Sequence, residues 1–287
     1  MSDTQEVYPL ARDEAESSRL NEQHNFLVHV TEGLIDSSIP LEDIATVADV
    51  GTGTGIWLFD TQNHLNAKIK IPNSPPRTFH GFDISSAQFP PSTPAGIELS
   101  VQDVLKPFPP EHHNRYDLVN VRMLVTGLAE KEYATAVENL VAILKPGGYL
   151  QWVELDCTAL PDSKDTQDPR ATTVVSTWLK FFELNKLSVS APATVADAYK
   201  QSGLLDIINT SFQLDNRGED LRAKARKWQL QAFSAVMPPV MLATGRAKDA
   251  AEAREKTDEA IRELGLYFEV GEVVGLAFGR VVGRKSV

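Results

Sequence analysis

The chain contains a glycine loop of a kind that binds nucleotide-like ligands. Gly51, Gly53 and Gly55 follow Asp49 at close spacing. Glycines let the backbone turn sharply and approach a ligand, and the helix expected after them offers free N–H groups. A dinucleotide fingerprint would need a glycine where this chain has Ile56, and the Gly-Lys-Ser/Thr of a phosphate-binding loop is missing. The loop therefore predicts a nucleotide-like ligand of another kind; a tight strand–helix turn that binds nothing is the alternative.

Polar residues stand at the ends of the next two predicted strands. Asp83 ends the second strand, where a carboxylate can accept hydrogen bonds from both ribose hydroxyls of a nucleoside. The same aspartate also suits a helix N-cap, and we favour the ribose role because it occurs together with the glycine loop. Gln102, Asp103 and Val104 follow the third strand, where an amide or carboxylate can contact an adenine amino group or simply form a turn.

Alternating strands and helices position these groups. Strands are predicted at residues 46–50, 78–82, 97–101, 116–121 and 149–155. Helices are predicted at 56–65 and near 133–144, the second ended by Gly147 and Gly148. This alternation favours a parallel sheet covered on both faces, with its ligand at the carboxyl ends of the strands.

The two ends of the chain add helical segments to this core. A helical pattern over residues 13–35, ended by Pro40, predicts an N-terminal helical cover over 1–40. The rest, 41–287, is expected to be one domain with a helical insert at 217–267. Further helices are predicted at 171–187, 194–202, 219–237 and 247–266, and further strands at 204–214 and 270–282. Pro238 and Pro239 are expected to fix the direction in which the chain leaves the insert.

Composition excludes several classes of protein. The 287 residues carry a net charge of −11 without a dense Lys/Arg block, which disfavours nucleic acid and acidic membranes as partners. The single cysteine, Cys157, forms no internal disulfide, and we expect no metal site. Met1 to Leu10 lacks a signal-peptide core, and no stretch approaches the roughly 20 apolar residues that span a bilayer. We therefore expect a cytoplasmic protein without membrane contact.

The strand-end groups together resemble the class I S-adenosylmethionine-dependent methyltransferases. The resemblance continues through segments 116–122 and 144–154, where Lys145 to Gly148 looks like the helix-to-strand-five signature of that superfamily. Segment 8–23 and Gln151 to Glu154 are similar to the fungal LaeA-like and UMTA-like methyltransferases, often found in secondary-metabolite biosynthesis. The resemblance implies an α/β fold with a doubly wound, Rossmann-like sheet of seven strands, mostly parallel with the last strand antiparallel.

The resemblance also implies S-adenosylmethionine as the cofactor and assigns residues to it. The glycine loop would pass under its methionine portion, Asp83 would hold the ribose, and the residues after strand three would line the adenine. Asn120 and Arg122 would lie beside the sulfonium, and Tyr8, Arg19 and Gln23 would belong to the N-terminal cover. The implied cofactor-binding residues are Tyr8, Asp49, Gly51, Gly53, Gly55, Asp83, Gln102, Asp103, Val104, Asn120 and Arg122.

Methyl transfer is an in-line displacement that needs a base only when the acceptor arrives protonated with a high pKa. His24 and Glu154 are the candidate bases, although His24 is more often a structural histidine and Glu154 equally suits a hydrogen-bond acceptor at the sheet end. The aromatic and methionine side chains of the insert suit a small apolar pocket, although such side chains are more often plain core. These candidate substrate-binding residues are Trp228, Phe233, Met237 and Met241.

We therefore expect methyl transfer to oxygen or nitrogen of a small, partly apolar metabolite. A small-molecule acceptor is the only partner that the sequence indicates. Two alternatives stay open: a cofactor-binding protein of this fold that catalyses a non-methylating reaction, and a regulatory subunit that binds the cofactor and a protein partner.

Overall fold

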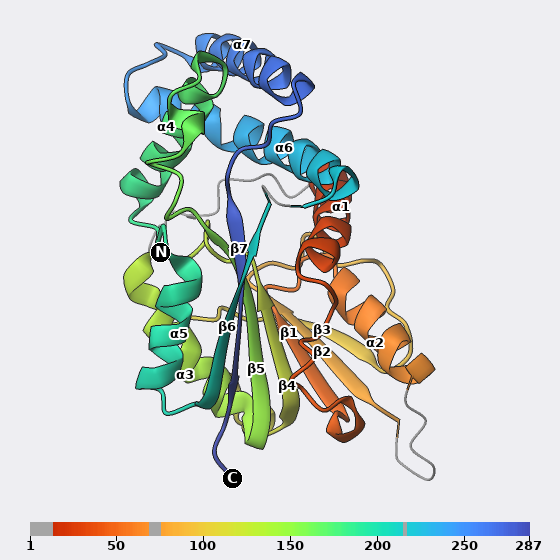
Figure 1. The fold of residues 1–287 in the computed structure, drawn as a ribbon. Coiled ribbons are helices and arrows are strands. Elements are labelled where there is room, and N and C mark those ends of the chain that lie inside the picture. Colours follow the sequence, from red (N-terminus) through yellow and green to blue (C-terminus); the bar gives the residue numbers. More distant parts are fainter. Residues whose placement is uncertain (1–13, 69–75, 215–216) are drawn as a thin grey trace.

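A seven-stranded sheet forms the centre of the molecule (Figure 1). The structure is a computed structural model that describes residues 14–68, 76–214 and 217–287. The strand order is β3-β2-β1-β4-β5-β7-β6, and β7 is antiparallel to both of its neighbours. The strands are β1 Thr46–Val50, β2 Thr78–Asp83, β3 Ile97–Val101, β4 Tyr116–Arg122, β5 Leu144–Asp156, β6 Leu205–Gln213 and β7 Ala277–Arg284. The predicted fold class is confirmed.

Helices cover the sheet and its carboxyl edge. They are α1 Glu14–Val30, α2 Ile56–Lys68, α3 Tyr133–Ile143, α4 Pro169–Asn185, α5 Ala191–Gln201, α6 Glu219–Ala243 and α7 Ala250–Glu269. Short 3-10 turns lie at η1 Leu41–Asp43, η2 Pro110–His112, η3 Glu130–Glu132 and η4 Lys164–Thr166. Helix α2 packs on β1 and β2, whereas α5 packs on α3 and on β5, β6 and β7.

Alternating side chains of each strand face opposite sides of the sheet, and this alternation divides the core. Val47 and Leu118 belong to the smaller apolar cluster on the side of α2, together with Trp57. Ala48 and Val119, their neighbours along the same strands, belong to the larger cluster on the other side. The two buried faces explain the near-continuous apolar strands that the sequence shows.

Helices α4, α6 and α7 pack together into a helical cap beyond the carboxyl ends of the strands, and α1 joins the cap through α6 (Figure 1). The starts of α4 and α7 are fixed by N-caps: Asp168 accepts a hydrogen bond from the Arg170 backbone N–H at 2.9 Å, and Asp249 accepts one from Glu252 at 2.9 Å. The cap therefore has defined helix boundaries that set which side chains point at the sheet edge.

Two predicted boundaries are wrong. Helix α6 continues through Pro238 and Pro239 to Ala243, because the residues on either side of the prolines, Met237 and Val240, are both buried and hold the helix in place. The last strand begins at Ala277 rather than at residue 270, since the chain first connects α7 to the sheet. Periodicity alone does not separate an apolar connection from an apolar strand.

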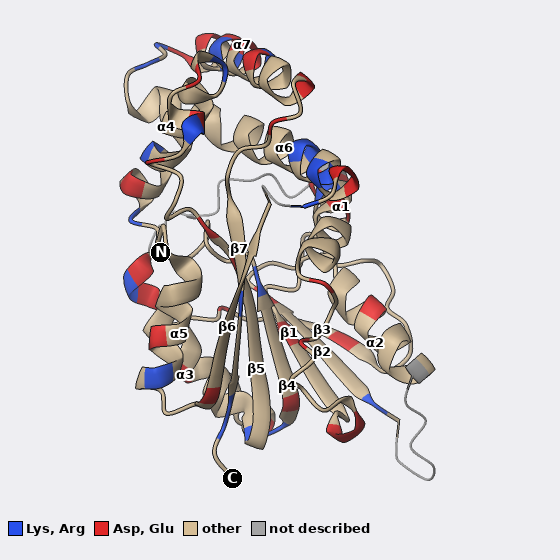
Figure 2. Cartoon of the chain, in the orientation of Figure 1, with Lys and Arg blue, Asp and Glu red and all other residues tan. Residues whose placement is uncertain are grey.

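Acidic and basic side chains alternate on the outer surface of the cap (Figure 2). Along α7, Glu252, Arg254 and Glu255 stand beside Lys256 and Asp258. This mixture fits a solvated helix face. In the part of the chain that the structure describes, no helix is both long and apolar enough to cross a membrane.

Candidate active site

A cavity of about 800 Å³ lies between the carboxyl edge of the sheet and the helices above it. Loops after β1, β2 and β3 form its floor, and α1, α4 and α6 with the chain after β4 form its walls. The volume falls within the range of small-molecule sites, and the position is where doubly wound sheets bind ligands. The sequence predicted this location from the order of the strand ends.

Each glycine of the loop after β1 lies close to a neighbouring side chain. Gly51 and Gly53 line the cavity with φ angles of +72° and +55°, a region that side-chain-bearing residues rarely adopt. A Cβ atom at Gly51 would lie 2.7 Å from Leu124 Cδ2, and one at Gly53 would lie 3.2 Å from Leu20 Cδ1. Gly55, with φ +79°, starts α2 outside the cavity lining. The glycines thus let the loop pack closely against Leu124 and Leu20 while its backbone borders the cavity.

Asp83 stands at the end of β2 and lines the cavity. One carboxylate oxygen accepts the Gly53 backbone N–H at 2.9 Å, and the other accepts the Ser85 N–H at 3.2 Å. Asp83 therefore combines the two roles considered from the sequence: it caps the chain after β2 and holds the glycine loop, while its carboxylate borders the cavity.

The loop after β3 brings Gln102, Asp103 and Val104 to the same side of the cavity. The Gln102 side-chain amide donates to the Asp103 carbonyl at 2.9 Å, and the Asp103 carboxylate accepts the Leu105 N–H at 2.9 Å. Asn139 of α3 donates to the Val104 carbonyl at 2.8 Å and anchors the loop from behind. The loop is thus held rigidly next to Asp83 and the glycines.

Asp49 and Asn120 lie beneath the cavity floor rather than in its lining. Asp49 accepts hydrogen bonds from the Asn120 amide at 2.7 Å and from the Thr52 hydroxyl at 2.8 Å, and Gln151 donates to Asn120 at 2.9 Å. Burial raises the pKa of the Asp49 carboxyl. This network joins β1, β4 and β5 and supports the glycine loop from below.

Arg122, His24 and Asp60 form a chain of contacts along one wall. Arg122 Nη1 lies 3.1 Å from His24 Nδ1, and His24 Nε2 lies 2.9 Å from the Asp60 carboxylate. Burial, together with the Arg122 charge, lowers the pKa of His24 to about 4, so its ring is neutral at pH 7. Because Arg122 can only donate, the neutral ring carries its proton on Nε2 and accepts at Nδ1. Both nitrogens of the predicted base are thereby engaged.

Glu154, the second candidate base, is fully buried and does not line the cavity. Its carboxylate accepts the backbone N–H groups of Leu124 at 2.7 Å and Val125 at 3.2 Å, and the Trp152 indole N–H at 2.8 Å. Burial raises its pKa to about 7. In this arrangement Glu154 shapes the loop after β4, whose residues Leu124 and Val125 do line the cavity.

The part of the cavity lining formed by α1, α4, α6 and the chain after β4 is mostly apolar and is called the apolar wall. Of the four insert residues predicted for the acceptor, Trp228 lines the cavity, whereas Phe233, Met237 and Met241 are buried core residues of α6 outside the lining. The other apolar side chains of this wall are Leu20, Leu27, Leu124, Val125, Leu128, Leu155, Trp178, Ala232, Ala235 and Val236. Trp178, on α4, was missed, because its contact with Phe233 of α6, with ring centroids 5.2 Å apart, joins segments that are far apart in the sequence.

Helices α1 and α6 hold each other over the cavity. The Gln23 side-chain carbonyl accepts from Arg19 at 2.6 Å and from the Trp228 indole at 3.1 Å. Phe26 stacks on Trp228 with ring centroids 5.6 Å apart. Arg19 and Gln23 thus take part in a cover, as predicted from the sequence, whereas Tyr8 lies outside the described residues.

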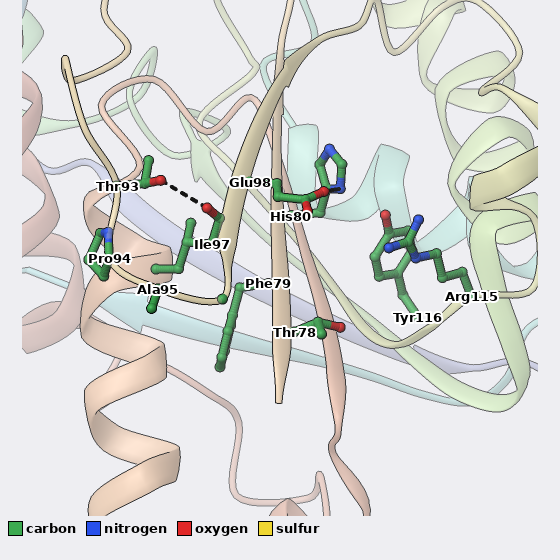
Figure 3. A pocket seen from close by; sticks show the side chains of 11 residues that line it. Thr78, Phe79, His80, Thr93, Pro94, Ala95, Ile97, Glu98, Arg115 and Tyr116 are labelled. Carbon is green, nitrogen blue, oxygen red and sulfur yellow. Dashed lines mark hydrogen bonds and ion pairs between the residues drawn. The ribbon is translucent and has the colours of Figure 1, made fainter. Parts of the chain in front are cut away.

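A second, smaller cavity of about 330 Å³ lies at the amino ends of β2, β3 and β4 (Figure 3). His80, Glu98 and Arg115 border it, and the His80 ring lies 2.9 Å from the Ser100 hydroxyl. Figure 3 shows Thr93 donating to the Ile97 carbonyl at its rim, at 2.9 Å. Parallel sheets bind their ligands at the opposite edge, so we assign the cofactor to the larger cavity.

Comparisons with known proteins agree with this fold and site. Methyltransferase grgD of a Penicillium species is 32% identical over 276 residues, which cover 94% of this chain and 96% of the relative. N-methyltransferase gliN of Aspergillus fumigatus is 26% identical over 99% of both chains. Phosphoethanolamine N-methyltransferase 2 of Haemonchus contortus has the same fold with a TM-score of 0.55 at 13% identity, over 92% of this chain and 53% of that one. No family model matches the chain.

The sheet order and the strand-end site define a class I methyltransferase fold, whose methyl donor is S-adenosylmethionine. With the full-length similarity to grgD, the chain belongs to the S-adenosylmethionine-dependent methyltransferases of the fungal type represented by grgD and gliN. The resemblance inferred from the sequence is confirmed, and the protein is an enzyme that transfers methyl groups.

Proposed function

We propose that the enzyme methylates an oxygen or nitrogen atom of a small, partly apolar secondary metabolite. The observation that carries this proposal is the division of one cavity into a polar floor and an apolar wall. A cavity of this volume holds a nucleoside and a small organic acceptor together, and the indoles of Trp178 and Trp228 suit an apolar ring system. The name of gliN, an N-methyltransferase, supports nitrogen as one of the possible target atoms.

The donor side fits S-adenosylmethionine in the chemistry of its residues. Gly51 and Gly53 line the cavity and are assigned to the methionine portion, and the Asp83 carboxylate at the end of β2 is suited to the ribose hydroxyls. Gln102, Asp103 and Val104 are assigned to the adenine. Asp49 and Asn120 are assigned a supporting role under the loop, because their side chains hydrogen-bond to each other there.

The bound donor supplies a methyl group on a positively charged sulfur, which is already an activated leaving group. The remaining work of the protein is to align the acceptor with that methyl group and to exclude water. The apolar wall and the contact between α1 and α6 serve both purposes. Both ring nitrogens of His24 and both carboxylate oxygens of Glu154 already have hydrogen-bond partners within the protein. We therefore assign both residues to positioning.

Incubation with isotopically labelled S-adenosylmethionine and a panel of phenols and amines tests the proposal. We expect label in at least one ring-bearing acceptor, detected by mass spectrometry, and none in strongly polar acceptors such as free glycine. The Ala232→Leu variant, which narrows the apolar wall, should lower labelling while the protein still binds S-adenosylhomocysteine, and Ala243→Leu at an exposed position of the same helix is the matched control. Binding of S-adenosylhomocysteine without transfer to any member of a broad panel would contradict the proposed function.

A further inference from the structure

The cations that border the main cavity differ in their partners. Arg19 is paired with the Glu16 carboxylate through two contacts of 2.6 Å. Lys106 lies on the exposed donor side. Arg122 stands at the end of β4, between the polar floor and the apolar wall. Among the described residues, no carboxylate lies within ion-pair distance of its guanidinium.

The guanidinium of Arg122 has hydrogen-bonding capacity left over. Nη1 donates to the neutral ring of His24, and the buried Nε has no partner within the described ranges. Asp49 of β1, Asp60 of α2 and Arg280 of β7 act electrostatically on its charge. The oxygens of Asp49 already accept from Asn120 and Thr52. A buried donor without an acceptor costs free energy, so this site favours a ligand that brings one.

The type of ligand follows from the charges in the cavity. A guanidinium and a sulfonium repel each other, because both are cations in a partly buried site. A negatively charged oxygen lying between them is attracted by both. It also accepts the unused N–H groups of Arg122 in the strong, charge-assisted geometry that arginine offers to oxyanions.

Resting on the proposed function, we propose that Arg122 binds an oxyanion of the acceptor, so that the enzyme selects acceptors with an acidic O–H, or an acidic N–H beside a carbonyl group. The acceptor releases its proton to bulk water as it binds. Its lone pair on oxygen, or on the conjugated nitrogen, then forms the bond to the methyl carbon. The carbon–sulfur bond breaks with its electron pair remaining on sulfur, and one negative and one positive charge are neutralised together.

The hydrogen bonds that the two candidate bases already make support binding of the acceptor as its anion. Both ring nitrogens of His24 have partners, and both oxygens of Glu154 accept backbone N–H groups. An acceptor that binds as its anion needs neither of them. His24 instead acts as a positioning residue, because its contact with Asp60 fixes the ring that orients Arg122.

Ionisation of bound 4-nitrophenol, a chromophore whose phenol and phenolate differ in absorbance, tests the proposal without turnover. The titration is done with the full chain saturated with S-adenosylhomocysteine. We expect the acid dissociation constant of the bound phenol to rise about tenfold or more in the unmodified enzyme. It should return to the value in water in the Arg122→Gln variant and stay raised in Arg122→Lys. Arg115→Gln, which removes an arginine from the amino end of the same strand, is the matched control and should behave as the unmodified enzyme.

Two results would overturn the proposal: binding of the neutral phenol, or an unchanged dissociation constant in Arg122→Gln. A second arm identifies the source of the oxyanion, since the donor also carries a carboxylate. If Arg122→Gln weakens binding of S-adenosylhomocysteine but not of 5′-methylthioadenosine, which lacks the amino-acid tail, Arg122 serves the donor and the acceptor proposal fails. We expect Arg122→Gln to change both affinities by less than about threefold.

Turnover separates this inference from the proposed function. Arg122→Gln should lower kcat/KM for acidic phenols on the order of 100-fold, as for loss of one oxyanion donor, with a smaller loss for amines. Methyl transfer with an equal loss for both acceptor classes contradicts the oxyanion role and leaves the proposed function intact. Ionisation of bound 4-nitrophenol without transfer to any acceptor would contradict the proposed function alone.

Discussion

The two sides of the main cavity are built in different ways. The donor side consists of short loops at the ends of three parallel strands, where backbone atoms and a few polar side chains border the ligand. The acceptor side consists of apolar side chains from α1, α4, α6 and the chain after β4, and α1 ends more than a hundred residues before α4 begins. The donor side is thus fixed by the sheet, whereas the acceptor side depends on how helices pack against one another.

This difference separates donor binding, which related methyltransferases have in common, from acceptor binding, which differs from one enzyme to another. Loops at strand ends keep their geometry as long as the sheet is intact, so a common donor can be bound by a common arrangement. A wall made of helix side chains changes shape with single substitutions and leaves the sheet untouched. Substitutions on the two sides should therefore have separable effects on donor affinity and on turnover.

The largest effect is expected at the glycine loop. Gly53→Val should abolish measurable binding of S-adenosylhomocysteine, because the new side chain meets Leu20 and the φ of +55° disfavours a branched residue. Isothermal titration calorimetry provides the measurement. Gly203→Val is the control, since Gly203 has a similar φ of +73° but open space around it. Equal donor affinity in a folded Gly53→Val variant would show that the loop is only a turn.

A smaller loss of donor affinity is expected at the end of β2. Asp83→Ala should weaken binding of S-adenosylhomocysteine by about 2–4 kcal/mol, as for the loss of charge-assisted hydrogen bonds to two hydroxyls. Some of this loss will come from the Gly53 contact, which the carboxylate also makes. Comparison with Asp83→Asn, which keeps one oxygen, separates the two contributions by calorimetry. Glu98→Gln at the second cavity is the control, and unchanged affinity in folded Asp83→Ala would exclude the ribose role.

On the acceptor side, a substitution should lower turnover and leave donor affinity nearly unchanged. Ala232→Leu adds bulk to the apolar wall, so kcat/KM for the acceptor should fall about tenfold or more through misplacement of the substrate. Donor affinity should stay within about twofold, because the residue is remote from the strand-end loops. Steady-state kinetics and calorimetry on the same preparation measure both. Ala243→Leu, at an exposed position of the same helix, should change neither quantity.

The smallest effect is expected for His24 and concerns the pH dependence of protein stability. The pKa of His24 lies near 4 in the folded protein and near 6.5 as a free side chain, so the unfolded chain binds more protons between these values. Stability should therefore fall as the pH drops from 6.5 towards 4, and His24→Gln should reduce this slope by up to about 1 kcal/mol per pH unit. Thermal unfolding across this pH range measures it. The exposed His29→Gln variant should keep the full slope.

The same contrast explains how much the sequence revealed. Asp83 and the glycines were predicted correctly as neighbours, because parallel strands bring their carboxyl ends to one edge whatever the loops between them do. The acceptor wall was predicted only in part: Trp228 lines the cavity, but Phe233, about 1.4 helical turns further on, points into the core. Which face of a helix meets a cavity depends on its rotation against other helices, and apolar periodicity marks buried faces of both kinds alike.

The hydrogen-bond partners of the site residues could not be predicted from the sequence either. Glu154 at the end of a strand and His24 on the face of the first helix indicated possible bases, yet in the structure both oxygens of Glu154 and both ring nitrogens of His24 have hydrogen-bond partners. The Asp49–Asn120 contact joins positions 71 residues apart in the chain. Such pairings depend on which residues of neighbouring strands lie side by side. This strand register becomes visible only in the assembled sheet.

The position of β7 has a consequence for how the protein is made. Strand β6 pairs only with β7 among the described strands, and β7 also completes the edge of β5. On the ribosome, β6 emerges long before Ala277–Arg284 and has no place in the growing sheet until those residues arrive. The nascent chain therefore carries two open strand edges until Ala277–Arg284 has been synthesised, and such edges are prone to pair with other chains. A chain that stopped before Ala277 would lose two strands of the sheet rather than one, so the synthesis of β7 is the step that closes the sheet during translation.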